Sequence, residues 1–183
     1  MALNEKATLF LSESIYYEPY SLYEEFSRLK IMSQRSAYSK MKSHQRIALW
    51  QEHFRRFSEF HSLTNEQVNF ISILNKKIIA LHSNDSTSEK NEQMVADTFR
   101  MALNHFTQEV AENLMSNLGV FSTFALDNNF TQDVNDNCSC SRSSDMCGIN
   151  SPCRRSFCMT KSFGCGLLWV FSCDGKCAGM QTQ

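Results

Sequence analysis

The segment "NCSCSRSSDMCGINSPCRRSFCMTKSFGCGLLWVFSCDGKC", residues 137–177, decides how this chain is organised. It contains all eight cysteines of the 183-residue protein, whereas the first 137 residues contain none. Five of the six glycines also lie beyond residue 147. This concentration predicts two unlike parts, a body without cysteine and a short C-terminal region rich in cysteine and turns.

The C-terminal region is too short to offset its conformational entropy by burying apolar surface alone, so it needs covalent or metal cross-links. It contains no C-x2-C pair and no histidine, although zinc sites usually combine such ligands. We therefore predict four disulfides and an oxidising compartment, with a metal site as the alternative. The predicted disulfide residues are Cys138, Cys140, Cys147, Cys153, Cys158, Cys165, Cys173 and Cys177.

The spacing of the cysteines leaves most of the pairing open. Cys138 and Cys140 are too close in sequence for a relaxed disulfide between them. Cys173 and Cys177 could either clip a turn together or be bridged elsewhere. The apolar run Leu167–Phe171 lies between two glycine-containing turns and is predicted to be one strand of a small β-hairpin.

Charge and apolar residues together suggest a contact surface in this region. Residues 138–183 contain five basic and two acidic side chains, a net charge of +3, and the preceding residues carry −4. We expect Trp169 or Leu168 to lie partly exposed beside Arg154, Arg155 and Lys161, because so small a module cannot bury all of its large apolar side chains. Such a surface would suit an anionic membrane, whereas the charge is too small to predict nucleic-acid binding. The alternative is that the tryptophan is simply a core residue.

The body shows apolar residues at helical spacing in four stretches, Ser21–Leu29, Ser43–His61, Thr64–Leu81 and Met94–Leu118. The second and third stretches are predicted to pack as an antiparallel hairpin, and the third begins with a capping box. Gly119 is expected to end the last stretch as a left-handed cap. The fold class is therefore mainly α, a bundle of about four helices followed by the small disulfide-rich module.

Three units follow from these patterns: a helical domain over residues 1–126, a polar linker over 127–136 and the cysteine-rich module over 137–183. The five histidines are scattered, and the chain contains no recognisable set of nucleophile, acid and base. We predict no enzyme activity and no cofactor. Residues 1–14 lack the pattern of a secretory signal. The expectation that the protein is secreted or periplasmic therefore rests on the predicted disulfides.

Two stretches of the C-terminal region, "NCSCSRSSDMC" at 137–147 and "GCGLLWV" at 164–170, resemble the bacteriocin fulvocin C-related family. The helical stretch "HQRIALWQEHFRRFSEFHSLTNEQVNFI", residues 44–71, resembles the N-terminal part of the same family. The end of this chain departs from the family pattern, because three residues separate Cys173 from Cys177 where the family has C-x-C. The last pairing is left open by that difference.

The resemblance implies a bacteriocin precursor, whose C-terminal module would act on the envelope or membrane lipid of competing bacteria. A processing protease, cutting in the linker, and an exporter would be its partners. The alternative is a secreted, non-enzymatic interaction protein, in which the module stays attached to the helices as a rigid binding knob. That alternative predicts a substantial interface between the two parts.

Overall fold

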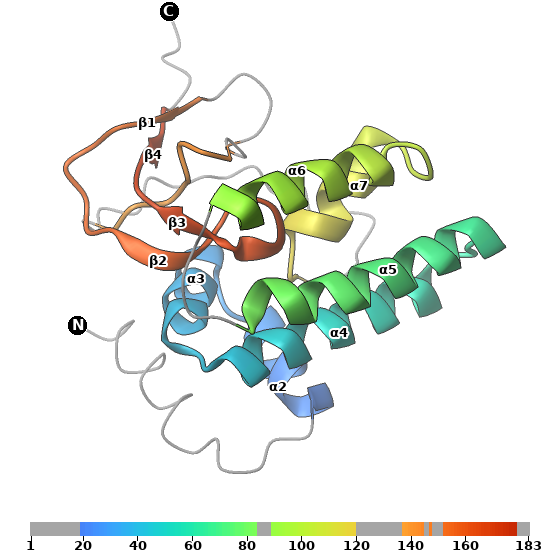
Figure 1. Cartoon of the computed structure of the whole chain (residues 1–183). Coiled ribbons are helices and arrows are strands. Elements are labelled where there is room, and N and C mark those ends of the chain that lie inside the picture. Colours follow the sequence, from blue (N-terminus) through green and yellow to red (C-terminus); the bar gives the residue numbers. More distant parts are fainter. Residues whose placement is uncertain (1–18, 84–88, 120–136, 145–146, 148–151, 179–183) are drawn as a thin grey trace, which may run out of the picture.

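The computed structural model describes residues 19–83, 89–119, 137–144, 147 and 152–178. Within them, six α-helices are followed by two pairs of short antiparallel strands (Figure 1). The predicted class, mainly α with a small disulfide-rich C-terminal region, is confirmed. The predicted linker over 127–136 lies outside the described residues.

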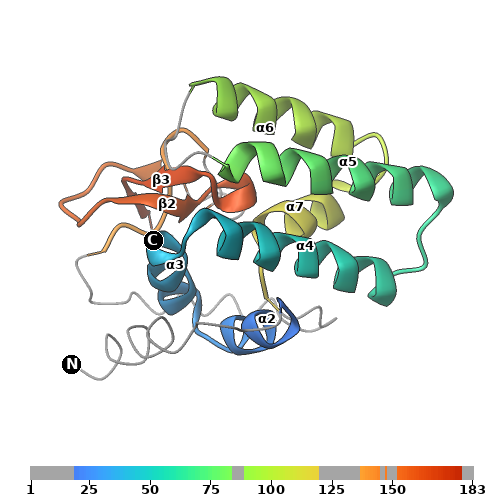
Figure 2. The ribbon, with the colours of Figure 1, turned by 60° about the horizontal axis from the view of Figure 1, so that its bottom comes forward.

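The helices follow the amphipathic stretches of the sequence closely in the middle of the body. They are α2 (Pro19–Ser27), α3 (Ile31–Lys40), α4 (Ser43–Phe60), α5 (Asn65–His82), α6 (Glu89–Ala102) and α7 (Gln108–Ser116). The views in Figures 1 and 2 agree that α4 and α5 lie side by side as a helical hairpin. The predicted capping box is present, because the Thr64 hydroxyl accepts from the Gln67 amide while the Gln67 side chain accepts from the Thr64 amide.

Several predicted helix limits were wrong. Helix α3 was not predicted, because its residues carry little apolar periodicity. The single helix expected over Met94–Leu118 is two helices, since a turn follows Ala102 and the Thr107 hydroxyl caps a new helix by accepting from the Val110 amide. The helix ends at Ser116, and Gly119 does not adopt the expected left-handed conformation.

The strands are β1 (Cys153–Arg154), β2 (Lys161–Cys165), β3 (Phe171–Cys173) and β4 (Lys176–Cys177). Strand β1 pairs with β4, and β2 pairs with β3, both antiparallel. A hairpin is therefore present, but the strand predicted over Leu167–Phe171 was largely wrong. Most of that run forms the 3-10 turn η1 (Leu167–Trp169) between β2 and β3.

The turn at η1 carries backbone strain where the apolar residues are largest. Gly166, Leu168 and Trp169 all have positive φ, of 69°, 53° and 52°. Non-glycine residues rarely adopt this left-handed region, so the surrounding structure must compensate for the strain. Here the compensation is burial, because Leu168 and Trp169 are 0% and 1% exposed. The chain bends away from a strand path and places both side chains in the protein core.

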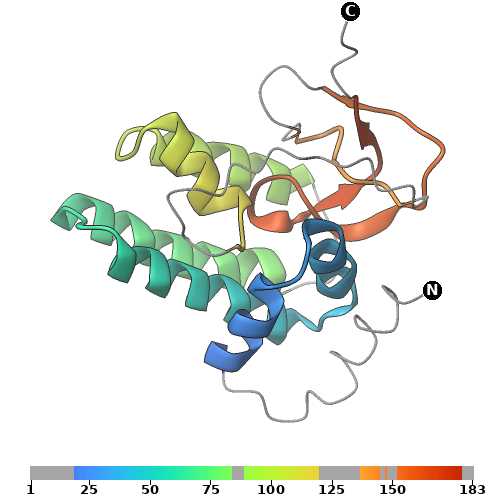
Figure 3. The same cartoon turned by 180° about the vertical axis from the view of Figure 1, so that it is seen from behind.

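That core is shared between the two parts of the chain. Apolar side chains of the helices and of residues 163–171 belong to one hydrophobic cluster. Figure 3 shows β2, η1 and β3 lying beside α3 and α7. The Trp169 ring packs against Tyr38 and Phe26, with ring centroids 5.1 and 6.0 Å apart. The disulfide-rich region therefore does not form its hydrophobic core alone.

Candidate functional site

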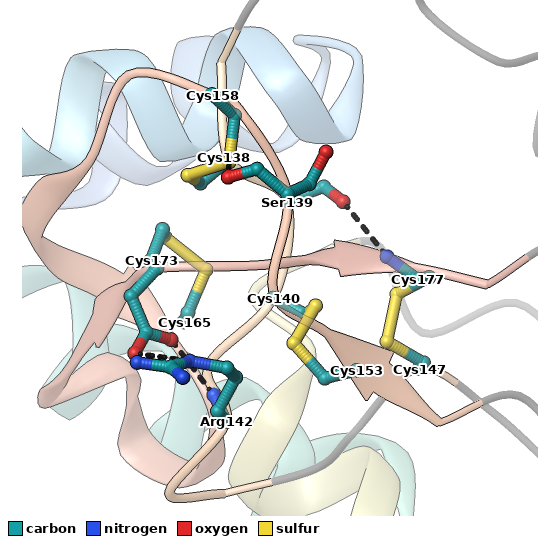
Figure 4. Close-up of a disulfide and its surroundings, with 12 residues drawn as sticks. Cys138, Ser139, Cys140, Arg142, Cys147, Cys153, Cys158, Cys165, Cys173 and Cys177 are labelled. Atoms are coloured by element: carbon teal, nitrogen blue, oxygen red, sulfur yellow. Dashed lines mark hydrogen bonds and ion pairs between the residues drawn. A yellow bond between two sulfur atoms is a disulfide. The ribbon is translucent and has the colours of Figure 1, made fainter.

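All eight cysteines form disulfides, as predicted (Figure 4). The pairs are Cys138–Cys158, Cys140–Cys153, Cys147–Cys177 and Cys165–Cys173. The expectation that Cys138 and Cys140 do not pair together is confirmed. Of the two alternatives for the last cysteines, the structure shows the second, because Cys173 and Cys177 are bridged to different partners.

The disulfides tie the strands together in two groups. Cys165–Cys173 closes the β2–β3 hairpin and, with Cys138, forms a small buried sulfur cluster. Cys140, Cys147 and Cys177 form a second group, in which the sulfur atoms lie within 4.8 Å of one another. In the oxidised protein these sulfurs belong to two neighbouring disulfides and are not the thiolates that bind zinc.

Polar contacts brace the same region (Figure 4). The Asp174 carboxylate accepts hydrogen bonds from the Arg142 amide at 2.8 Å and from Arg142 Nε at 2.9 Å. The Cys140 carbonyl oxygen accepts from the amides of Asp174 and Gly175. A Cβ at Gly175 would lie 2.7 Å from the Arg154 carbonyl oxygen and from Cys153 Sγ, so only glycine fits at this close approach.

The seam between the helices and the disulfide-rich region is closed by hydrogen bonds. Trp169 Nε1 donates to the Ser116 carbonyl oxygen at 2.8 Å. His82 Nε2 lies 3.2 Å from the Leu168 carbonyl oxygen, which can only accept, so Nε2 carries the hydrogen. The same nitrogen lies 3.1 Å from Tyr38 Oη, which accepts from Trp50 Nε1 at 2.9 Å. The Leu168 carbonyl oxygen and the Trp169 indole N–H therefore both meet polar partners inside the body.

The predicted contact surface agrees with the structure only in part. Trp169 or Leu168 was expected to lie partly exposed, and this was wrong because the helices cover both. The alternative, that Trp169 is a core residue, is what the structure shows. Lys161 is partly buried where β2 packs on α3. Arg154 and Arg155 are exposed, so the structure keeps only these two of the five predicted contact residues at the free surface.

The exposed apolar residues of the C-terminal region lie elsewhere. Phe157 is fully exposed, at 104% of its reference area, and Met159 is 61% exposed. Both lie in the loop Arg154–Met159, next to the exposed arginines. Sequence reasoning missed them, although the signal was present in "RRSFCM", where large apolar residues follow two arginines within a cysteine-anchored loop. We call this loop, Arg154–Met159, the knob.

Comparison with known protein families, curated proteins and solved structures gives no match for this chain. The relation to the fulvocin C-related family therefore stays an expectation. None of the helices among the described residues combines the length and apolar character needed to cross a bilayer. The four disulfides are consistent with a protein that functions outside the reducing cytosol.

Acid should weaken the seam through His82. Burial lowers the pKa of this imidazole to about 4, whereas an exposed histidine in the unfolded chain titrates near 6.5. As the pH falls below about 6.5, the unfolded chain binds the proton first. We expect this contribution, on the order of 3 kcal/mol, to be lost between about pH 6.5 and pH 4.

Urea unfolding at a series of pH values measures this loss. The His82→Gln variant removes the titrating group, so its stability should depend less on pH than that of the wild type. His44 is exposed on α4, and His44→Gln serves as the matched control for replacing a histidine by glutamine. Equal slopes in His82→Gln and the wild type would contradict the assignment.

Proposed function

We propose that this protein is a secreted, non-enzymatic interaction protein, in which the disulfide-rich region stays docked on the helices and presents the knob to a partner. The observation that supports this most strongly is the shared core. Leu168 and Trp169 are buried under the helices, so they stabilise the attachment of the disulfide-rich region to the body. Contacts with a partner would then be made by the knob.

The knob is held rigidly. Cys153, which immediately precedes the knob, is linked to Cys140, and Cys158 near its end is linked to Cys138. The Cys138 amide also donates to the Met159 carbonyl oxygen at 3.0 Å. A loop that is already ordered loses little conformational entropy on binding, which favours affinity.

The chemistry of the knob favours an anionic, partly apolar partner. Phe157 and Met159 offer apolar surface, while Arg154 and Arg155 form no ion pair among the described residues. An exposed aromatic ring beside arginines without an ion pair suits an interface with anionic lipid. The ring would enter the region between headgroups and acyl chains, and the guanidinium groups would contact the anionic headgroups. The membrane lipid of a bacterial envelope is the partner that we propose.

Binding to vesicles tests this function. The intact protein should bind vesicles of phosphatidylglycerol more strongly than vesicles of phosphatidylcholine in a sedimentation assay. Phe157→Ser should weaken that binding by roughly 10- to 100-fold, since burying a phenylalanine contributes about 1.5–3 kcal/mol. Phe60, which is 53% exposed on α4, provides the matched control, and Phe60→Ser should bind as the wild type does. Equal binding by both variants would contradict the proposed role of the knob.

A bacteriocin precursor is the second candidate, and one observation favours it. The helices cover Leu168 and Trp169, which would be exposed on a released C-terminal region, so the body could act as a mask until cleavage. Cleavage at a protease site inserted between residues 120 and 136 would distinguish the two candidate functions. Cut pieces that co-elute and do not inhibit bacterial growth support the first candidate, whereas pieces that separate and inhibit growth support the second.

A further inference from the structure

Basic side chains from both parts of the chain meet where α3 packs on β2. Arg35 and Lys40 belong to α3, and Lys161 begins β2. The two elements are in close contact, since a Cβ at Gly164 of β2 would lie 3.3 Å from the Arg35 carbonyl oxygen. The seam between the helices and the disulfide-rich region is therefore lined here by positive charge.

Two of these cations, Arg35 and Lys161, have nitrogens without a hydrogen-bond partner among the described residues. Arg35 Nε, Arg35 Nη1 and Lys161 Nζ are shielded from solvent and make no hydrogen bond. No described acidic side chain forms an ion pair with either residue. A buried cationic nitrogen without an acceptor is costly, and native proteins normally pair such atoms with protein, water or an ion.

The electrostatics agree with this geometry. Burial lowers the pKa of the Arg35 guanidinium to about 10, so the group stays charged at neutral pH. The pKa of Lys161 is lowered first by burial and then by the charges of Arg35 and Lys40. Repulsion among these like charges would be relieved by an anion bound between them.

We propose that the seam between α3 and β2 binds a small oxyanion such as inorganic phosphate, held by Arg35 and Lys161 with Lys40 at the rim. The planar guanidinium matches two oxygens of a tetrahedral anion, and the lysine adds a compact charge. A free anion suits the site better than a lipid headgroup, because the nitrogens are shielded from the surface. The bound anion would connect the helical body to the disulfide-rich region, and this site is separate from the knob.

Thermal unfolding in phosphate and in chloride of equal ionic strength tests the site. With phosphate about a hundredfold above its Kd, the Tm of the wild type should rise by roughly 5–10 °C. Arg35→Met and Lys161→Met should lose this rise. In chloride their Tm should equal or exceed that of the wild type, because an unpaired buried charge has been removed. Lys76, which is exposed on α5, provides the control, and Lys76→Met should keep the rise.

Calorimetric titration of the wild type with phosphate is a second measurement that needs no variant to fold. Saturable 1:1 binding supports the site, and absence of binding overturns it. Equal Tm shifts in all variants would show a general salt effect and would also overturn it. Binding to vesicles with phosphate headgroups that requires Arg35 and Lys161, without binding of free phosphate, would assign the site to lipid and reject a small anion.

Discussion

Reduction of the four disulfides should unfold the C-terminal region and loosen the helices that pack against it. The disulfides close loops with sequence separations of 8, 13, 20 and 30 residues. Each such bond contributes about 2–4 kcal/mol, so the set contributes on the order of 10 kcal/mol. The strands have two to five residues each, too few to hold the region together without cross-links.

The effect should reach the body because the core is shared. After treatment with a phosphine reductant, we expect loss of the near-ultraviolet circular dichroism signal and faster hydrogen exchange in α3 and α7, which contact β2 and η1. Helix α4 should retain more protection. Thiol titration controls for complete reduction and should give eight free groups. Unchanged exchange in α3 and α7 with all thiols free would contradict the shared core.

Replacing Trp169 by alanine should cost about 3–5 kcal/mol, the range for large aromatic residues buried in a core. The ring is 1% exposed and packs on Tyr38 and Phe26, and its Nε1 hydrogen bond to Ser116 is also lost. Alanine at φ 52° keeps the strained backbone while losing the burial that compensates for it. Urea unfolding followed by the helical signal measures the loss, because the residue supports the helices as well as its own region.

Phe157→Ala is the matched control for this substitution. It removes a large aromatic ring from the same region, but the ring is fully exposed and contributes no core packing. Its effect on the free energy of unfolding should stay within about 0.5 kcal/mol. Similar losses for the two variants would mean that Trp169 does not join the two parts.

Local patterns allowed much of the body to be predicted. Apolar periodicity located α4 and α5, and the capping box of Thr64 and Gln67 located the start of α5. The disulfides were predictable because eight cysteines in a short region leave few other ways to stabilise it. These features depend on residues close together in the chain.

Features that depend on distant residues were missed. Helix α3 has a weak pattern of its own, and its place follows from packing on β2. The run Leu167–Phe171 contains strong strand formers, yet most of it is a turn, because Leu168 and Trp169 gain more by entering the helical core than by continuing a strand. With these side chains buried, the exposed large apolar residues of the described C-terminal region are Phe157 and Met159.

The sequence alone determined that a helical body precedes a region held by disulfides, since helical periodicity and cysteine density are properties of residues close together in the chain. Only the tertiary structure decided which cysteines pair, whether Trp169 is buried and which basic residues meet at the seam. The physical reason is that each of these outcomes depends on contacts between residues far apart in the chain.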